Sequence, residues 1–384
     1  MINITDKSQC CGCTACANIC PKEAIIMVPD DMGFKYPKVD ISKCIECGLC
    51  QKICAFNDNY DKSLNLKEPK IYAARHKDIH EVETSRSGAA FIAISDYILE
   101  NGGIVYGVGY KEHFKVVHKR ATTKEERNEF KGSKYVQSDL YGIFKHVKED
   151  LKKGYTVLFS GTPCQTAGLN SFVGNKLREN LILVDIVCHG VPSPYIWKDY
   201  LDYIENKYKS KIVKVDFRDK SRVGWSGHIE SFVFENGEKI ESKIYTCLFQ
   251  QNIILRPSCC KCHFTNTIRP SDITIADFWG WKNINSDINN DNKGISLVFL
   301  NTEKGVDIFD FIKDKMTVIS TNLDFCMQPN LIHPSVLHSL HYKFRHDYKH
   351  NGFEYVISRD YNSGLLFLLT SYFNRIFKYI KSIF

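Results

Sequence analysis

Two runs of four cysteines near the start constrain this chain more than any other feature. Both runs have the spacing C-x2-C-x2-C-x3-C, and their members are Cys10, Cys13, Cys16, Cys20, Cys44, Cys47, Cys50 and Cys54. Zinc sites are usually built from two separated C-x2-C pairs, whereas each short segment here carries four cysteines. The repeated spacing is typical of bacterial two-cluster ferredoxins, so it predicts two 4Fe-4S clusters.

The spacing also predicts which cysteines share a cluster. In the bacterial pattern, the first three cysteines of a run hold one cluster and the fourth reaches the other. Cys54 is therefore expected to complete the site begun by the first run, and Cys20 that of the second. Cys11 breaks no spacing, and we expect it to be a bystander. Ala55 stands where the pattern usually has proline, which removes no ligand.

Length, charge and cysteine content limit the class of protein to which this chain can belong. The 384 residues exceed the roughly 250 to 300 at which a single core stops growing, so we expect at least two domains. The start has no export signal, and sixteen cysteines in an unexported chain favour metal thiolates over disulfides, so we expect a cytoplasmic protein. The formal charge of +7 is scattered along the chain, which argues against a nucleic-acid partner. No apolar run approaches the roughly 20 residues that span a bilayer.

The rest of the chain alternates helical and strand-like segments. SGAAFIAISDYILENGG has helical spacing, whereas YTVLFS and NLILVDIVC are typical of strands. The pair Asn236-Gly237 predicts a hairpin, so the sheet is expected to be mixed and the fold class α/β (α+β). The predicted organisation is a ferredoxin domain over 1–60, a linker over 61–69, an α/β domain over 70–320 and a C-terminal helical extension over 321–384.

Further cysteines follow predicted strands, where α/β sheets gather ligands. Cys164 follows YTVLFS and Cys188 ends ILVDIVC, while Cys259 and Cys262 form a C-x2-C pair. These four thiols are the number that a third 4Fe-4S cluster requires. A zinc site, a redox pair and unrelated packing cysteines are the alternatives, and Cys164 alone could be a nucleophile. The remaining cysteines are expected to be buried small side chains, and they are Cys247, Cys260 and Cys326.

Seven motifs in a fixed order give the chain a family resemblance. They are SRSGAAF, KGSKYVQS, LFSGTPCQTAGL, DIVCHGVPSP, FRDK, GW and SDITIADFWG. Together they resemble the family of coenzyme F-420 hydrogenase/dehydrogenase beta subunits, in the version with a fused N-terminal two-cluster ferredoxin domain. The resemblance covers residues from about 5 to 300 and implies a mixed-sheet flavin-binding domain.

The resemblance implies an iron–sulphur flavoprotein oxidoreductase. Such a protein exchanges a hydride between FAD and a soluble carrier, either the deazaflavin F-420 or NAD(P)H, and its clusters pass single electrons to or from a redox partner protein. A flavin fits this role because it takes two electrons as hydride and releases them singly. No GxGxxG fingerprint follows a strand, so a Rossmann-type flavin site is not expected. The alternative is an electron-transfer or partner-docking subunit without a substrate of its own.

The resemblance also implies cofactor-binding residues. They are Ser85, Ser87, Gly88, Gly132, Ser133, Lys134, Tyr135, Gln137 and Ser138. Arg218 and Lys220 are expected to stabilise a reduced flavin or an anionic substrate. A solvated turn, a helix start or a solvated face are the alternatives for these segments. Hydride transfer requires no acid or base, so no catalytic residue is predicted.

Two residues beside the predicted sites have more than one interpretation, and so does the C-terminal tail. His189 is either a structural residue or a donor to a cluster or flavin, and Asp277 either lines the site or caps the loop that follows. The tail LLFLLTSYFNRIFKYIKSIF alternates apolar and basic residues at helical spacing. It is expected to contact a membrane surface or a partner, or else to pack on its own domain.

Overall fold

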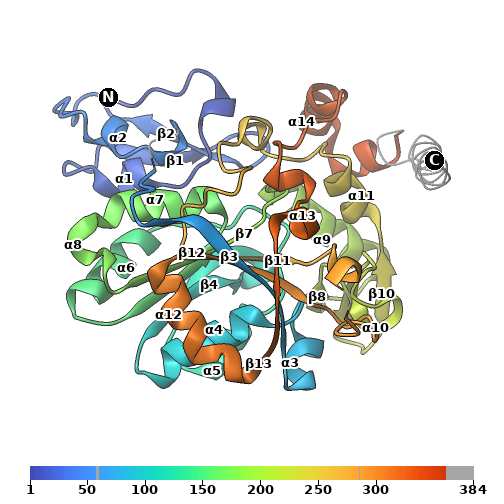
Figure 1. Cartoon of the computed structure of the whole chain (residues 1–384). Coiled ribbons are helices and arrows are strands. Elements are labelled where there is room, and N and C mark those ends of the chain that lie inside the picture. Colours follow the sequence, from blue (N-terminus) through green and yellow to red (C-terminus); the bar gives the residue numbers. More distant parts are fainter. Residues whose placement is uncertain (58–59, 285, 360–384) are drawn as a thin grey trace, which may run out of the picture.

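The computed structural model of the chain describes residues 1–57, 60–284 and 286–359 (Figure 1). Its N-terminal region contains η1 Lys7–Gln9, α1 Ala15–Ile19, β1 Ile25–Pro29, β2 Lys35–Val39, α2 Leu49–Lys52 and η2 Ala55–Asn57. Strands β1 and β2 pair antiparallel, with Ile25 opposite Val39. The hairpin lies between the two cysteine runs, and the short helices α1 and α2 each contain a cysteine of one run.

A single mixed sheet of eight strands forms the body of the protein. Its order is β13-β3-β12-β11-β7-β6-β4-β5. Strands β4, β6, β7 and β11 run parallel to one another, whereas the outer pairs are antiparallel. The strands are β3 Asn65–His76, β4 Ile104–Lys111, β5 Lys115–Ala121, β6 Val157–Gly161, β7 Leu181–Ile186, β11 Ile273–Asp277, β12 Ser296–Thr302 and β13 Met316–Thr321.

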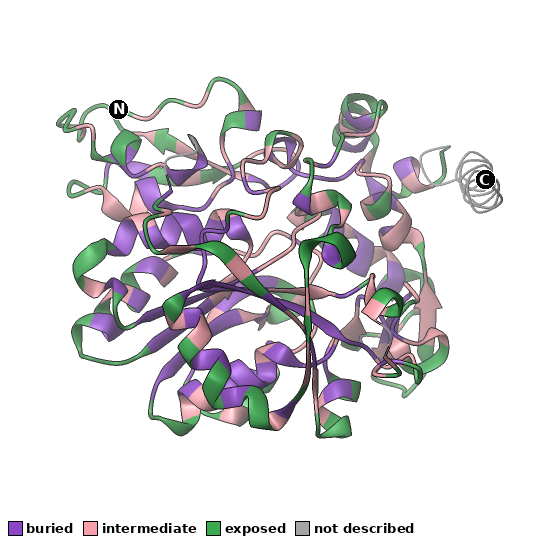
Figure 2. Cartoon of the chain, in the orientation of Figure 1, coloured by how far each residue is buried: buried purple, intermediate pink, exposed green. Residues whose placement is uncertain are grey.

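Residues of the parallel central strands are buried (Figure 2), and Val157, Leu158 and Phe159 of β6 are each 0% exposed. Along β6, Val157 and Phe159 join one apolar cluster, and Leu158 between them joins another. Successive side chains point to opposite faces of a strand, so a continuous apolar run such as YTVLFS requires cover on both sides. That cover comes from the helices of the body.

The helices divide between the two faces. Helices α6 Ile143–Lys152 and α7 Pro163–Val173 contribute to the Phe159 cluster. Helices α4 Ala90–Glu100 and α12 Glu303–Ile312 contribute to the Leu158 cluster. The short connecting helices are α3 Ile79–Thr84, η3 Glu112–Phe114, α5 Lys124–Asn128, α8 Asn175–Arg178, η4 Pro257–Lys261, η5 Trp281–Ile284 and η6 Lys313–Lys315.

The N-terminal region shares a core with the body. Its residues Cys13, Ile53 and Phe56 belong to the same apolar cluster as Phe159 and Phe172 of the body. Figure 1 shows α1 lying against α7 at the top of the sheet. The two parts are therefore packed together rather than joined only by a flexible segment.

Strand β3 differs from the predicted linker over 61–69. It begins at Asn65 and contains Pro69. In this stretch Asn65 and Lys70 pair with β12 on either side of a register irregularity, and the pairing with β13 starts at Ile71. Within the described residues, β13 does not pair with this stretch and Pro69 has no ladder partner, which fits both its polar side chains and its proline. The linker prediction is corrected from Asn65 onward.

A smaller antiparallel sheet lies beside the main one. It contains β8 Ile212–Asp216, β9 Glu230–Phe234 and β10 Lys239–Ser242, and the predicted Asn236-Gly237 turn joins the last two. Helix α9 Pro194–Tyr208 begins at Pro194, where Ser193 Oγ accepts a hydrogen bond from the Ile196 N–H group at 3.1 Å. Two further short helices are α10 Lys220–Val223 and α11 Ile244–Gln250.

The C-terminal elements pack on the fold as far as the structure describes them. They are α13 Leu323–Cys326, η7 Pro329–Leu331 and α14 His341–Ile357. Phe344, Phe353 and Val356 of α14 join the apolar cluster of α9 and the small sheet. The tail from residue 360 onward, for which we expect a membrane or partner contact or packing on its own domain, lies outside the described residues. No helix within the described ranges is both long and apolar enough to cross a membrane.

Candidate functional site

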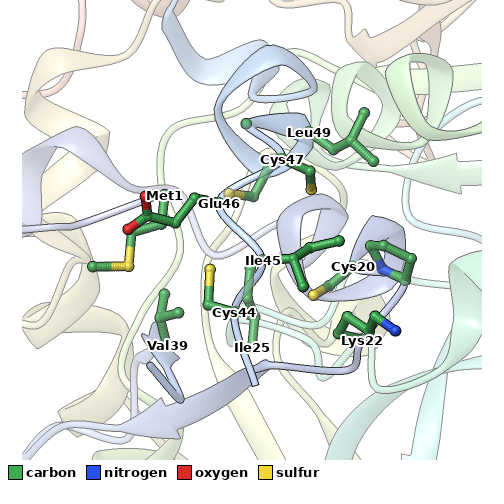
Figure 3. Close-up of a pocket in the computed structure, with 13 residues that line it drawn as sticks. Met1, Cys20, Lys22, Ile25, Val39, Cys44, Ile45, Glu46, Cys47 and Leu49 are labelled. Atoms are coloured by element: carbon green, nitrogen blue, oxygen red, sulfur yellow. The ribbon is translucent and has the colours of Figure 1, made fainter. Parts of the chain in front are cut away.

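The eight N-terminal cysteines gather at two places. The first cysteine site is a small hollow lined by Cys10, Cys13, Cys16 and Cys54, and Cys11 also lies on its wall. The second cysteine site is lined by Cys20, Cys44, Cys47 and Cys50. Figure 3 shows the second site, where Cys20, Cys44 and Cys47 surround one space beside Ile45 and Leu49. Each site combines three cysteines of one run with the fourth of the other, which is the grouping that the spacing predicts.

The backbone around both sites has the same local geometry. Gly12 and Thr14 flank Cys13 with φ of +72° and +68°, and Glu46 and Gly48 flank Cys47 with φ of +50° and +74°. Left-handed residues turn successive N–H groups toward one side, which suits an anionic group. The Ala24 N–H group also donates to Cys20 Sγ at 3.3 Å. The two loops therefore fit thiolate-ligated clusters in chemistry as well as in cysteine number.

The two sites differ in exposure. Cys13, Cys16 and Cys50 are buried, whereas Cys47 is exposed. Next to Cys47, Ile45 and Leu49 are 57% and 40% exposed. The second site is therefore the one that reaches the surface of the molecule.

The third cysteine set comprises Cys164, Cys188, Cys259 and Cys262, and the structure brings its members together. Cys259 Sγ accepts a hydrogen bond at 3.4 Å from the N–H group of Val191, in the loop after Cys188. Burial, together with neighbouring thiolates of the set, raises the pKa of Cys188 above its ordinary value. The same causes raise the pKa of Cys259 and of Cys262 to about 12. The four thiols therefore lie near enough to influence one another's pKa, and a third cluster at this set stays a prediction.

Local geometry presents Cys164 at the start of α7. The N–H group of Thr162 donates to the side-chain oxygen of Gln165 at 3.0 Å, which closes the first turn, and Pro163 begins the helix. A hydrogen bond with the Cys11 thiol lowers the pKa of Cys164 to about 7 against the effect of burial, and contact with Thr162 adds to it. Among the described residues, no histidine contacts this thiol.

Cys11, expected to be a bystander, lies between two candidate ligands. Its thiol is within hydrogen-bonding reach of both Cys13 and Cys164. Cys13 in turn packs on α7, because a Cβ added to Gly168 would lie 2.8 Å from Cys13 Sγ. Cys11 and Gly168 therefore allow close approach between the first cysteine site and the third cysteine set.

A central cavity of about 500 Å³ opens beside the third cysteine set. It lies where β6, β7 and β11 end, and these strands are parallel, so their carboxyl ends meet at one edge of the sheet. Cys188 lines the cavity from the end of β7, and Asp277 from the end of β11. Seven of the nine predicted cofactor residues line it, namely Ser85, Ser87, Gly132, Ser133, Lys134, Tyr135 and Ser138.

The other two predicted cofactor residues have different contacts. Gln137 donates to the Cys11 carbonyl at 2.9 Å, so it faces the N-terminal region rather than the cavity. Gly88 lies against backbone, because an added Cβ would come within 2.3 Å of the Ala74 carbonyl oxygen and 2.6 Å of the Ser296 nitrogen. Gly88 therefore allows close packing of backbone, and Gln137 connects the body to the N-terminal region. Sequence spacing alone does not distinguish these roles from cofactor contact.

We expect Gly88→Ala to destabilise the fold. The added methyl group overlaps backbone atoms of β3 and β12, and overpacking of this kind typically costs about 1–3 kcal/mol. Ala89→Gly is the matched control, because Ala89 has φ of +63° at the start of α4 and glycine relieves that strain. Chemical denaturation should show a lower unfolding free energy for the first variant and an equal or higher one for the second. Equal stability of Gly88→Ala and the wild type would contradict this packing role.

Arg218 and Lys220, both predicted to act on an anion, are placed differently. Arg218 lines the cavity, lies over the Trp279 ring and pairs with Asp277 at 2.5 Å. Lys220 donates to the carbonyl oxygens of Val82 and Lys293, each at 2.7 Å, and does not line the cavity. The Trp225 indole donates to Asp277 at 2.8 Å, so Asp277 fixes Arg218 and the tryptophan loop.

Arg86 is a cavity residue that sequence reasoning missed. Its Nη2 atom lies 3.2 Å from Asp216, whereas its Nη1 atom is buried without a hydrogen-bond partner among the described residues. Ser85 Oγ beside it is also buried and unpartnered there. The SRSG motif contains both residues, but an arginine in a surface-like polar segment carries no periodic signal. Two unpaired donors on the wall of a cavity fit a ligand that is rich in acceptor oxygens.

Two titratable side chains at this cavity are shifted by burial. Burial lowers the pKa of Lys134 to about 7, and its ammonium group donates to the carbonyl oxygens of Glu129 and Lys131. Burial lowers the pKa of His228 to about 4, so this ring is neutral at pH 7. The cavity can therefore present a variable positive charge at Lys134 and a fixed one at Arg86.

His189 is held as a structural residue. Its ring nitrogens contact the side-chain amides of Asn252 at 2.6 Å and Asn330 at 3.3 Å, and its edge meets Phe249. Both polar atoms are thus occupied by protein groups, although the residue lies on the cavity wall. The structure favours the structural interpretation of this histidine.

Two family models match the chain. Residues 154–324 match the model for the C terminus of the coenzyme F-420 hydrogenase/dehydrogenase beta subunit, and residues 9–57 match the 4Fe-4S dicluster domain. The second match decides between iron–sulphur clusters and zinc at the N-terminus in favour of clusters.

Individual relatives resemble the whole chain or its start. The F subunit of the F(420)H(2) dehydrogenase of Methanosarcina mazei is 22% identical over 326 residues, which cover 82% of this chain and 86% of that relative. An uncharacterized ferredoxin of Methanocaldococcus jannaschii is 37% identical over 54 residues, 14% of this chain and 69% of that ferredoxin. A chain from the structure of the F-420-reducing NiFe hydrogenase complex of Methanosarcina barkeri aligns with a TM-score of 0.46 and 17% identity, covering 77% of this chain and 93% of its own length.

Proposed function

The chain belongs to the family of coenzyme F-420 hydrogenase/dehydrogenase beta subunits, and on that premise we propose that it exchanges a hydride with a soluble carrier at an FAD held in the central cavity. The family makes it an iron–sulphur oxidoreductase subunit. The central cavity is the main support for a bound FAD. Its volume is about 500 Å³, and its walls include the unpaired donors of Ser85 and Arg86 as well as Cys188.

The residues on the cavity wall suit the parts of this cofactor. Arg86, Ser85 and Lys134 supply cationic or hydroxyl donors for phosphate oxygens. Arg218, held by Asp277 and lying over Trp279, supplies positive charge for a reduced anionic ring. A flavin would supply the step that converts a two-electron hydride into single electrons. Bulky apolar residues such as Phe91 and Phe249 exclude water from the same space.

The arrangement of the cysteines supports an electron path to the surface. The third cysteine set, as a proposed third 4Fe-4S site, borders the cavity at Cys188. Cys11 links its member Cys164 to Cys13 of the first cysteine site. The second cysteine site then ends at exposed Cys47. We infer that a redox partner protein docks beside Cys47, Ile45 and Leu49.

The carrier is proposed to be the deazaflavin F-420 rather than NAD(P)H. The name of the Methanosarcina mazei relative states that it belongs to an F(420)H(2) dehydrogenase. The likeness covers 82% of this chain and 86% of that relative, so it extends over most of the body. A cavity with two arginines on its wall also suits an anionic carrier.

Anaerobic purification followed by flavin, iron and sulphide quantitation tests this function. We expect about one FAD per chain, and reduced F-420 should bleach the flavin absorbance of the isolated protein whereas NADPH should not. Bleaching by NADPH alone would replace the proposed carrier. Clusters without flavin would instead favour an electron-transfer or docking subunit with no substrate of its own.

We expect flavin binding to weaken as pH rises through about 7 because of Lys134. Burial lowers the pKa of this lysine to about 7, so the ammonium group is charged below that pH and neutral above it. If the charged form binds phosphate, the dissociation constant of FAD should rise about tenfold between pH 6 and pH 8. Fluorescence titration of the flavin-free protein measures this change.

Two variants separate Lys134 from other causes of that pH dependence. Lys134→Gln should remove most of the change, because the titrating amine is gone. Lys131→Gln is the matched control, since Lys131 lines the same cavity but pairs with Glu81. An unchanged pH profile in Lys134→Gln would show that another group controls binding.

A further inference from the structure

Arg256 crosses from the body of the protein to the first cysteine site. Its side chain is 0% exposed. Its Nε atom donates to the Cys10 carbonyl at 2.8 Å, and its Nη2 atom donates to the Lys35 carbonyl at 2.9 Å. The Nη2 atom also lies 3.8 Å from Cys10 Sγ, and the guanidinium covers the Tyr36 ring at 4.3 Å. A buried cation therefore touches a candidate cluster ligand directly.

This arginine differs from the comparably buried arginines of the protein. Arg127, Arg218 and Arg269 each pair with an aspartate. Around Arg256, the remaining hydrogen-bond partner is the Gln137 side-chain oxygen at 2.8 Å, and no carboxylate pairs with it in the part of the chain that the structure describes. An unpaired buried charge is costly, so a counter-charge is expected next to it. Cys10 of the first cysteine site is the thiol that contacts this guanidinium, and Cys11 and Cys259 also lie near enough to act on it.

The second cysteine site has no such buried cation in the described part of the chain. The charged side chains on its wall are Lys22 and Glu46, which are both exposed. Exposed charges are screened by water and salt and act weakly on a buried group. Arg256, a residue of the body, therefore gives the two cysteine sites of the N-terminal region different electrostatic environments.

We propose that Arg256 is a positioning residue whose fixed charge makes the cluster of the first cysteine site easier to reduce than that of the second. Reduction adds one electron to an anionic cluster and exchanges no proton or bond, so a nearby cation stabilises the reduced state. In the cell the electron comes from the carrier or the redox partner protein, and in the test it comes from dithionite. This inference requires only the dicluster domain, so it stands or falls separately from the flavin and the third cluster.

Redox titration of the anaerobically purified full chain, followed by electron paramagnetic resonance, tests this role. In Arg256→Gln we expect one N-terminal cluster to become at least tenfold harder to reduce in equilibrium constant, which is about 59 mV for one electron. The other cluster should keep its potential. Arg256→Lys keeps the charge and should recover most of the loss. Lys22→Gln is the matched control at the second site and should shift neither potential.

Two results would overturn this role for Arg256. One is an Arg256→Gln protein with full iron content and unchanged potentials. The other is an Arg256→Lys protein that behaves like Arg256→Gln, since geometry rather than charge would then matter. If Arg256→Gln loses iron, the two cluster potentials of the wild type still test the role. Cys47→Ser changes the signal of the second cluster and so identifies which potential belongs to it. A buried cation predicts that the first cluster has the higher potential and keeps it in about 1 M salt, whereas a lower potential, or a difference that salt abolishes, contradicts it.

Discussion

Cys164→Ser should reduce the iron content of the chain by about four atoms while leaving about eight in place. The wild type is then expected to hold about twelve, because the third cysteine set would carry a cluster in addition to the two N-terminal ones. Cys164 lies in the first turn of α7, and burial together with Cys259, Cys164 and Cys262 raises the pKa of Cys188. Serine is a poor replacement for a thiolate ligand, so one substitution should empty the site. Iron and sulphide assays on anaerobically purified protein measure the change.

Cys260→Ser is the matched control for this loss. Cys260 adjoins Cys259, but its thiol donates to the Pro257 carbonyl at 2.8 Å, and a serine hydroxyl can make the same hydrogen bond. This variant should keep all of the iron. About eight irons in the wild type would remove the third cluster. Full iron in Cys164→Ser together with lost activity would make Cys164 a nucleophile instead.

Local patterns explain why much of the site was predictable. The cysteine runs indicate their chemistry within a few residues, and their spacing also predicts the mixing of the two runs that the structure has. Cys164 and Cys188 were found because parallel strands bring their carboxyl ends to one edge, so their position follows from strand order. The same reasoning placed Asp277 at the end of β11.

The residues that were missed or misplaced depend on distant contacts. Arg256 acquires its role only when Cys10 and Tyr36 fold against it, and no spacing in the sequence links them. Gly88 resembled a phosphate-binding glycine, but its environment is backbone from β3 and β12. The polar stretch before Lys70 resembled a linker because, among the described residues, β13 does not pair with β3 there. In each of these examples, the role of the residue or segment depends on neighbours that are distant in the sequence.

Arg86→Gln should weaken FAD binding by about 10- to 100-fold, the effect of losing about 1.5–3 kcal/mol of charge-assisted hydrogen bonding. The Nη1 atom of Arg86 is buried on the cavity wall without a partner among the described residues, so a bound phosphate oxygen would be its acceptor. Burial lowers the pKa of Arg86, so its charged form is disfavoured unless further anionic groups lie next to it. We therefore expect the flavin-free variant to unfold at the same temperature as the wild type or above it.

This combination distinguishes a ligand-binding residue from a structural one. If Arg86 mainly held Asp216, its removal would lower stability and flavin affinity together, although Asp216 also accepts the Arg218 N–H group at 2.8 Å. Arg222→Gln is the matched control, because Arg222 is an exposed arginine that pairs with Glu241 on the surface, where such pairs contribute little. Flavin titration, iron content and thermal unfolding of both variants test the assignment. Unchanged FAD affinity in Arg86→Gln, with the iron retained, would place the phosphates elsewhere in the cavity.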